Sequence, residues 1–251
     1  MPVRYARFLT GRHRTVAANR QLGFTLEAVA GAINAGGFLA VQQYTSHVTG
    51  MLSSLADNLA LGRLGLVVDA VVGVLAFLVG AMCTAMMVNF ARRRGMHSEY
   101  ALPLVLEAAL TLCFGLAGAR LSQYEGLLVP FTVVLLCFIM GLQNAVVTKL
   151  SAGVVRTTHM TGILTDLGIE LGKLVYWNAD DGPAHRVRAD RDRIAVLGGL
   201  LVSFCAGAVS GAFGFSRFGY AFTVPIAVLL LALAAVPMLD DVRRALRDGA
   251  R

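Results

Sequence analysis

The chain has 251 residues, of which 57 % are hydrophobic and only 15 % charged. Soluble globular domains average about 25 % charged residues, so this composition argues against a soluble protein. The net charge of +7 alone would suit nucleic acid, but the basic residues lie in the breaks between apolar blocks. The basic residues form no stripe interleaved with aromatics, and no zinc-type Cys/His spacing occurs. We therefore exclude nucleic acid as a partner.

Six apolar blocks follow one another along the chain. Each is long enough to cross ~30 Å of hydrocarbon as a helix. The blocks are continuously apolar and lack the two-residue alternation of a membrane barrel. We therefore predict an all-α, polytopic membrane helix bundle with the lipid bilayer around it, and an uncleaved first span in preference to a secretory signal. The predicted spans are Gly23–Val41, Gly65–Phe90, Ala101–Ala119, Leu127–Val147, Ile194–Phe215 and Gly219–Leu239.

The Lys and Arg residues predict the orientation. With the N-terminus inside, the inner segments hold all but three of the 22 basic residues. Only Arg63, Arg120 and Arg217 fall outside, which is a strong positive-inside signal. It predicts a bacterial inner (plasma) membrane protein with a basic cytoplasmic N-terminus over 1–22 and a cytoplasmic tail over 240–251.

Three pairs of matched segments indicate that residues 121–239 repeat the pattern of residues 23–120. Because each half carries three spans, the two copies would run in opposite directions across the membrane. This inverted-repeat plan is common in secondary transporters. The matches are Ser46–Ser53 with Thr158–Thr165, Gly31–Asn34 with Gly141–Asn144, and Phe77, Gly80, Ala81 and Ala85 with Phe204, Gly207, Ala208 and Ala212.

Two Thr-Gly segments, Gln42–Gly62 and Arg156–Lys173, are too polar for comfortable lipid-facing spans. We expect each to dip into the membrane and return as a re-entrant or broken helix, the first running from about Thr49 to Leu61. Such backbone is tolerated at depth only inside protein or beside water. If both segments crossed fully instead, the chain would have eight spans and parallel repeats.

A half-helix that starts at the midplane presents unpaired N–H groups and positive partial charge. A threonine hydroxyl could cap that turn, and the following glycine allows close approach. Two such starts would form a central site for an anion, a carboxylate or a small polar solute. Packing alone is the competing explanation. The candidate substrate-binding residues are Asn34, His47, Thr49, Gly50, Gln143, Asn144, His159, Thr161 and Gly162.

Other polar residues are weaker candidates for a functional role. Glu107 lies inside a predicted span, where a carboxylate is costly unless it faces protein or water, and is a candidate for proton coupling. Glu27 and Asp69 lie near span ends, where interfacial solvation would explain them. His47 and His159 could be ligand donors, proton carriers or buried hydrogen-bonded residues. No carboxylate or cysteine joins them at ligand spacing, so we expect no metal and no cofactor.

The matched segments resemble the YoaK family of bacterial integral membrane proteins (domain of unknown function 1275). The resemblance rests on the Thr-Gly signature after the first span, on Gly141-Leu142-Gln143-Asn144 and on the Arg156–Gly162 stretch, and it covers about residues 20–240. Where Asn34 stands the family usually has an acidic residue, and where Met51 stands it often has Asn. The resemblance implies a membrane location but no substrate.

We interpret the chain as a transporter or channel for a small-molecule or ion substrate. The alternative is a non-transporting assembly partner or sensor. An intramembrane enzyme is not expected, because no nucleophile–base pair, metal-ligand set or phosphate-binding loop is visible. Small residues such as Gly207-x-x-x-Gly211 allow close helix packing and permit a homodimer without requiring one.

Overall fold

The computed structural model describes residues 16–96, 98–150, 160–178 and 186–248, and every regular element within these ranges is helical. The long helices match the predicted spans, and two shorter helices match the Thr-Gly segments. In chain order the elements are α2 (Val16–Val41), α3 (Val48–Ala60), α4 (Leu64–Arg93), α5 (Ala101–Gly118), η1 (Leu121–Gln123), α6 (Glu125–Leu150), α7 (Met160–Val175), α8 (Arg191–Phe218), η2 (Gly219–Phe222) and α9 (Thr223–Asp248).

Within the described residues, five helical segments are long and apolar enough to cross a membrane. Four of them coincide with α2, α4, α5 and α6, and the fifth, Arg191–Leu239, runs through α8 and η2 into α9. The chain turns at Gly219, whose φ of 58° is a conformation that glycine adopts without steric cost. The chain thus has the helices of an α-helical membrane protein.

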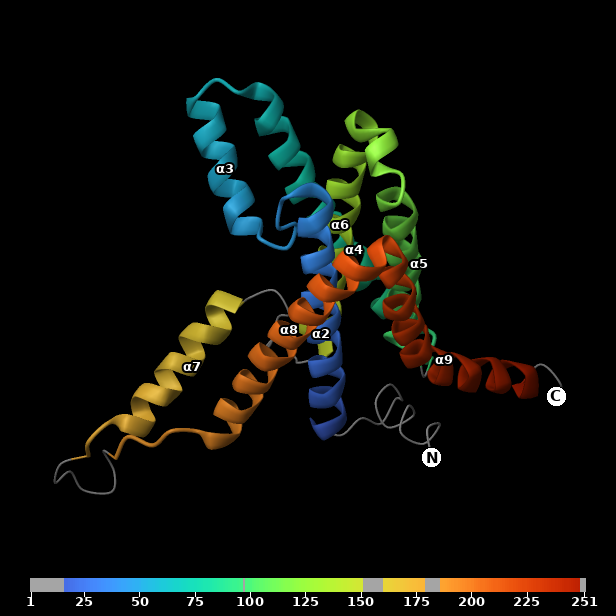
Figure 1. Ribbon diagram of the computed structural model, residues 1–251. Coiled ribbons are helices and arrows are strands. Elements are labelled where there is room, and N and C mark those ends of the chain that lie inside the picture. The colour runs from blue at the N-terminus through green and yellow to red at the C-terminus, as the bar shows by residue number, and fades with distance from the viewer. Residues whose placement is uncertain (1–15, 97, 151–159, 179–185, 249–251) are drawn as a thin grey trace.

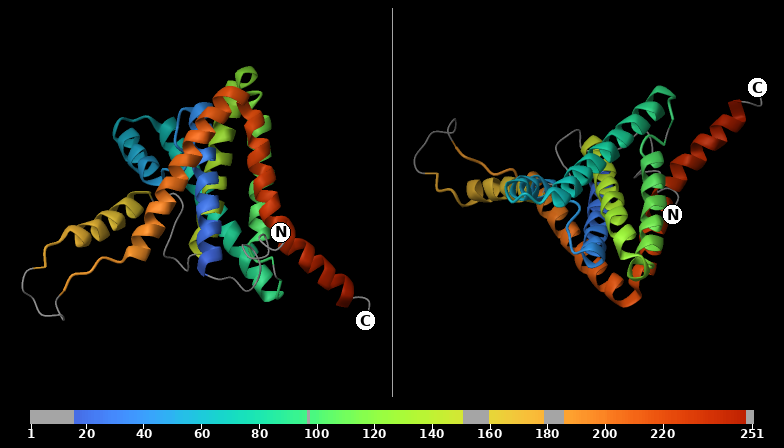
Figure 2. Two further views of the ribbon diagram at one scale, coloured as in Figure 1. Left: turned by 60° about the horizontal axis from the view of Figure 1, so that its bottom comes forward. Right: turned by 90° about the horizontal axis from the view of Figure 1, so that it is seen from above.

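The long helices form one bundle in which successive helices reverse direction (Figure 1). In that view α2, α5 and α8 rise, whereas α4, α6 and α9 descend. The first and last of these helices therefore begin and end at the same end of the bundle. The short helices α3 and α7 begin at mid-height and project to one side, α3 upward and α7 downward (Figures 1 and 2).

The halves of the chain pack against each other along three long helix contacts, one of which joins α5 to α9. We call the other two seams. One seam joins α2 to α8, and the other joins α6 to α4. A Cβ added at Gly31 would overlap the carbonyl oxygen of Phe204, and one added at Gly141 would overlap that of Phe77. Close backbone approach at small residues is the usual way in which membrane helices associate.

The paired helices also approach closely at two further glycines, which match each other in the sequence repeat. Gly207 leaves no room for a Cβ beside the carbonyl of Ala28, and Gly80 leaves none beside the carbonyl of Phe138. One turn farther on the seams differ in chemistry. Gly211 lies against Ala32 of α2, whereas the Thr84 hydroxyl donates a hydrogen bond to the Leu142 carbonyl at 2.8 Å.

The buried core lies where α2, α5, α6 and α9 meet, with Leu26, Leu104, Leu136 and Leu230 at its centre. Half of the most apolar stretch of α2 is buried, against 11 % in α4. The large side chains of α4, among them Leu75 and Met86, are exposed. In a membrane protein such a face contacts lipid, because no apolar driving force requires it to be covered.

Polar contacts tie the two short helices to their neighbours in different ways. Glu170 of α7 is buried and accepts hydrogen bonds from Lys173 at 2.8 Å and from the backbone N–H of Asp190 at 3.0 Å, while Arg193 of α8 pairs with Asp166 at 3.0 Å. In α3 the matching position is Asn58, which is neutral. Its amide donates to the Ser54 carbonyl at 2.7 Å.

Candidate functional site

The segment between α2 and α3 folds back onto α2. Gln42 has a φ of 54° directly after the last residue of α2, and its N–H donates to the Phe38 carbonyl at 2.8 Å. The Tyr44 ring then stacks on the Phe38 ring at 4.6 Å between centroids. The Ser46 hydroxyl donates to the Asn34 side chain at 2.8 Å. These contacts carry the chain back to the level at which α3 begins.

The start of α3 corrects one detail of the sequence analysis. The helix begins at Val48, with His47 at the N-cap position, and no side chain caps its free N–H groups. Thr49 therefore lies within the first turn, one residue past its first position, and its hydroxyl does not cap the helix. The glycine that follows is explained by sterics, because a Cβ at Gly50 would overlap the imidazole ring of His47. Gly50 thus makes room for the histidine.

The second short helix begins similarly within the part that the structure describes. α7 starts at Met160, so Thr161 and Gly162 lie in its first turn, where Thr49 and Gly50 lie in α3. His159, the partner of His47 in the sequence repeat, lies outside the described residues. Within the described residues Thr161 is the second residue of α7, as Thr49 is of α3.

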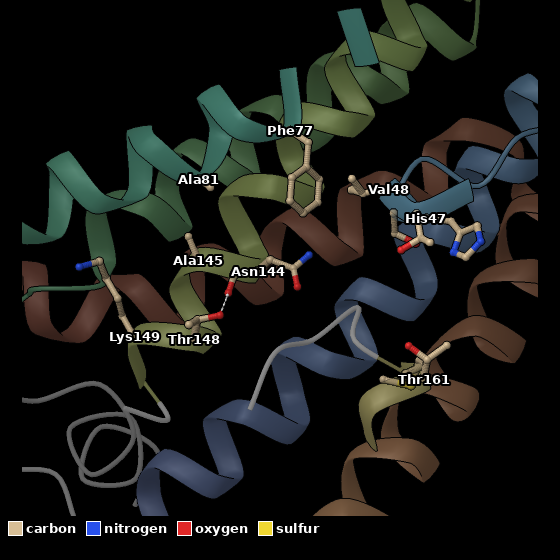
Figure 3. Close-up of a pocket in the computed structure, with 12 residues that line it drawn as sticks. His47, Val48, Phe77, Ala81, Asn144, Ala145, Thr148, Lys149 and Thr161 are labelled. Atoms are coloured by element: carbon tan, nitrogen blue, oxygen red, sulfur yellow. Dashed lines mark hydrogen bonds between the residues drawn. The ribbon is translucent and has the colours of Figure 1, made fainter. Parts of the chain in front are cut away.

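A cavity of about 590 Å³ lies between α4, α6 and the starts of α3 and α7. Asn144, Ala145, Thr148 and Lys149 follow one face of α6, with Phe77 and Ala81 of α4 above them (Figure 3). His47 and Thr161 lie across the space from this face (Figure 3). The full lining is Ser46, His47, Val48, Thr49, Phe77, Ala81, Asn144, Ala145, Thr148, Lys149, Met160 and Thr161.

A second cavity of about 680 Å³ lies between α2, α8 and the same connecting segment. The two cavities share Ser46, His47 and Met160 as walls. The first extends toward Lys149 at the end of α6, and the second toward Leu39 near the end of α2. The second lining is Asn34, Ala35, Phe38, Leu39, Tyr44, Ser46, His47, Met160, Phe204, Ala208, Val209 and Ala212.

The helix residues that line the two cavities correspond in part in the sequence repeat. Asn144 and Ala145 of the first cavity correspond to Asn34 and Ala35 of the second. Phe77 and Ala81 correspond in the same way to Phe204 and Ala208. The helices α2 and α6 run in opposite directions (Figure 1). The first cavity reaches Lys149 at the end of α6 and the second reaches Leu39 near the end of α2, so the two extend toward opposite ends of the bundle.

Few of the described residues that line the cavities are charged. Among the described lining residues no carboxylate occurs, and Lys149 is the one side chain that is permanently basic. The starts of α3 and α7 add the partial positive charge of helix N-termini. The remaining polar groups are amides and hydroxyls. Thr148 donates to the Asn144 carbonyl at 2.7 Å, and Asn144 donates to the Met140 carbonyl at 2.9 Å.

Five predicted site residues line these cavities, namely Asn34, His47, Thr49, Asn144 and Thr161. The other predicted site residues that the structure describes line neither cavity. Gln143 is fully buried and donates to the Leu26 carbonyl at 2.9 Å, so its amide links α6 to α2. Gly50 and Gly162 lie within the first turns of α3 and α7. Glu107 is buried within α5 and lines neither cavity. Its role in proton coupling stays a prediction.

Sequence reasoning missed several lining residues. Phe77, Ala81, Phe204 and Ala208 were recognised only as repeat matches, although that match was the signal that paired them across the site. It also misplaced Glu27. The helix begins at Val16, well before the predicted Gly23, so Glu27 lies near the middle of α2 and is fully buried. Interfacial solvation does not explain it.

A family model matches most of the chain. Residues 22–236 match the family described as a protein of unknown function (DUF1275). The chain belongs to this family. The matched region covers most of α2, every helix from α3 to η2 and about half of α9, and so includes both cavities. No curated protein and no solved structure matches the chain.

Proposed function

We propose that this DUF1275 protein is a transporter or channel for a small polar solute in the bacterial inner membrane. It would move the solute without chemical change and without a cofactor. Six spans would form two inverted three-span repeats with both chain ends in the cytoplasm. α3 and α7 would be re-entrant helices that meet near the midplane.

The inverted repeat is supported by direction and by contact. Helices that match in sequence run in opposite directions, as α2 and α6 do (Figure 1). The glycine contacts Gly31–Phe204 and Gly141–Phe77 join matching positions across the two seams. A two-fold relation between the halves accounts for both facts at once.

The observation that carries the proposal is the pair of matched cavities that meet at His47. Each would be a vestibule on one side of the membrane, and the region around Ser46, His47 and Met160 would separate them. Movement of α3 and α7 against the seams would expose this region to one vestibule at a time. Alternating access of this kind is general among transporters built from inverted repeats.

The charge favours an anion or a carboxylate. Lys149 lines one vestibule, two helix N-termini point toward the centre, and no described lining residue is acidic. Helix N-termini bind anionic groups through free N–H groups. A cation would find amides and hydroxyls here but no negative charge to balance it.

The test uses the full chain in liposomes and a panel of probes comprising small monocarboxylates, small dicarboxylates, inorganic phosphate and a neutral polyol. We expect flux of at least one anionic probe. The double variant Thr49→Val with Thr161→Val should lose it, because both hydroxyls line the first cavity. The matched control is Thr25→Val with Thr165→Val, whose hydroxyls bond to their own helices. Equal flux in both double variants would overturn the site assignment.

The orientation has its own test. Single cysteines at Arg63 and Arg93, in a variant without the four native cysteines, should react with membrane-impermeant reagents from opposite sides. With six spans the cysteine at position 63 reacts from the outside and the one at position 93 from the cytoplasm. The reverse assignment would instead indicate full crossing by the Thr-Gly segments and eight spans.

One observation favours the alternative of a membrane assembly partner. α3 and α7 project from the bundle and expose Leu52, Leu59, Leu164 and Leu171. A partner protein could bury these side chains. This alternative predicts no flux for any probe and a stable partner on co-purification.

A further inference from the structure

Glu27 is a buried carboxyl group that the proposed site does not use. Its side chain has no exposed surface, and neither of its oxygens has a hydrogen-bond partner among the described residues. It lies near the middle of a membrane-crossing helix. A carboxylate in that setting is costly, and intramembrane acids usually serve ion or proton movement.

The contacts of neighbouring residues on α2 show which face of the helix Glu27 occupies. A Cβ at Gly199 of α8 would overlap the ring of Phe24, and Gly31 packs on the carbonyl of Phe204. Residues three and four apart share a helix face, so Glu27 lies on the face of α2 that forms the α2–α8 seam. Asn34, seven residues on, continues this face and lines the second cavity.

No charged group on the neighbouring helices stands ready to balance a carboxylate there. Between Ile194 and Ser216, α8 contains one titratable residue, Cys205, which is exposed. Between Gly126 and Thr148, α6 contains only Cys137, which packs beside Gly73 of α4. The nearest charges on these helices are Arg193 at the start of α8 and Lys149 at the end of α6, while α2 itself carries Arg20 two turns away.

We propose that Glu27 is a proton-binding site that gates the α2–α8 seam. With a proton bound, the neutral carboxyl fits the dry seam. On release of the proton to water, the carboxylate requires hydration, which the seam gives only if α2 and α8 separate. Phe204, Ala208 and Ala212 of α8 also line the second cavity, so this separation widens that vestibule. The inference rests on the proposed function, in which this cavity is a vestibule.

The α4–α6 seam has no carboxyl group at the matching position. The sequence repeat places Cys137 where α2 has Glu27, and Cys137 is buried beside Gly73 and close to Met51. A thiol there needs no hydration at neutral pH. Proton release therefore opens one vestibule and leaves the other unchanged, so that a proton gradient could drive a solute in one direction.

The experiment compares two reporters at matching positions, Ala208→Cys in the α2–α8 seam and Ala81→Cys in the α4–α6 seam. Each is placed in a background whose four native cysteines are replaced. A water-soluble maleimide labels the full chain in liposomes over a series from about pH 5 to about pH 9. The ratio of the two labelling rates removes the ordinary pH dependence of the thiol.

We expect this ratio to rise at least about fivefold as Glu27 releases its proton, because linkage ties proton release to seam opening. Glu27→Gln should hold the ratio constant at its low-pH value. Asp69→Asn, a control at an exposed carboxyl of α4, should keep the rise. Glu27→Asp keeps a titratable group and should move the midpoint without removing it.

A ratio that is flat in the parent, or a rise that persists in Glu27→Gln, would overturn the proton gate. The test requires no solute. Its failure is therefore distinct from a failure of the flux experiment, which concerns Thr49 and Thr161.

Discussion

The two seams of the bundle have the same geometry and different polar chemistry. In both, a glycine of the first helix packs on a phenylalanine carbonyl, and a glycine of the second helix packs on the first helix in return. Around this crossing, the α4–α6 seam has the Thr84 hydrogen bond and a buried thiol, whereas the α2–α8 seam has a third glycine and a buried carboxyl. The comparison teaches that backbone fit holds the halves together, and that side chains distinguish the two seams.

The largest effect should come from the crossing glycines. Gly31→Ala and Gly141→Ala each place a Cβ against a backbone carbonyl, which cannot rotate away. We expect each change to lower the free energy of unfolding in detergent by about 3 kcal/mol. Gly23→Ala and Gly198→Ala are the controls, because an added Cβ meets nothing there. Tolerance of one crossing variant but not the other would break the equivalence of the seams.

A smaller effect should distinguish the seams from each other. Thr84→Val removes the hydroxyl that donates to the Leu142 carbonyl while it keeps the side-chain shape. We expect a loss of about 1 kcal/mol, the usual net value of a buried hydrogen bond. Thr84→Ser keeps the donor and should recover most of it. If Thr84→Val unfolds no more easily than the parent, the α4–α6 seam depends on packing alone.

The smallest and most local effect should separate α7 from α3. The hydrogen bond from Lys173 holds the pKa of Glu170 below its ordinary value of 4.5. A lowered pKa means that Glu170 stabilises the contact of α7 with α8 above that value, and that this contribution is lost as the pH falls through the lower pKa of the folded state. Hydrogen-exchange protection factors of α7 should fall in acid, and Glu170→Gln should reduce them at neutral pH.

The matched control for that prediction is Asp57→Asn on α3, where the carboxyl is exposed. It should leave protection of both short helices unchanged. Equal loss in α3 on acidification would show that the difference between Glu170 and Asn58 has no structural effect.

Much of the architecture follows from sequence because hydrophobic length and small-residue spacing are local properties. The six apolar blocks largely coincide with long helices, and α3 differs from its expected start at Thr49 by one residue. The choice of partner helix was not predictable, since an apolar face suits lipid and protein equally. The contacts in the folded structure, among them those of the glycines, show that α2 pairs with α8.

The candidate site was predicted in outline through the repeat, and its errors have physical causes. Arg20 and the polar residues around it suggested a membrane boundary, so Glu27 was placed at a span end. Backbone hydrogen bonding carries the helix through those residues, and the carboxyl lies at its middle. The imidazole of His47, which occupies the space above Gly50, could not be inferred from a Thr-Gly pattern.

The pairing of α2 with α8 also affects how the protein is made. The first membrane helix leaves the ribosome long before its partner exists, because most of the chain lies between them. At roughly 5–20 residues per second, that interval lasts about ten seconds or more. During this time the glycine face of α2 has only lipid or a chaperone beside it. Insertion of the second half is therefore the event that completes the first, and neither half is expected to mature when it is synthesised alone.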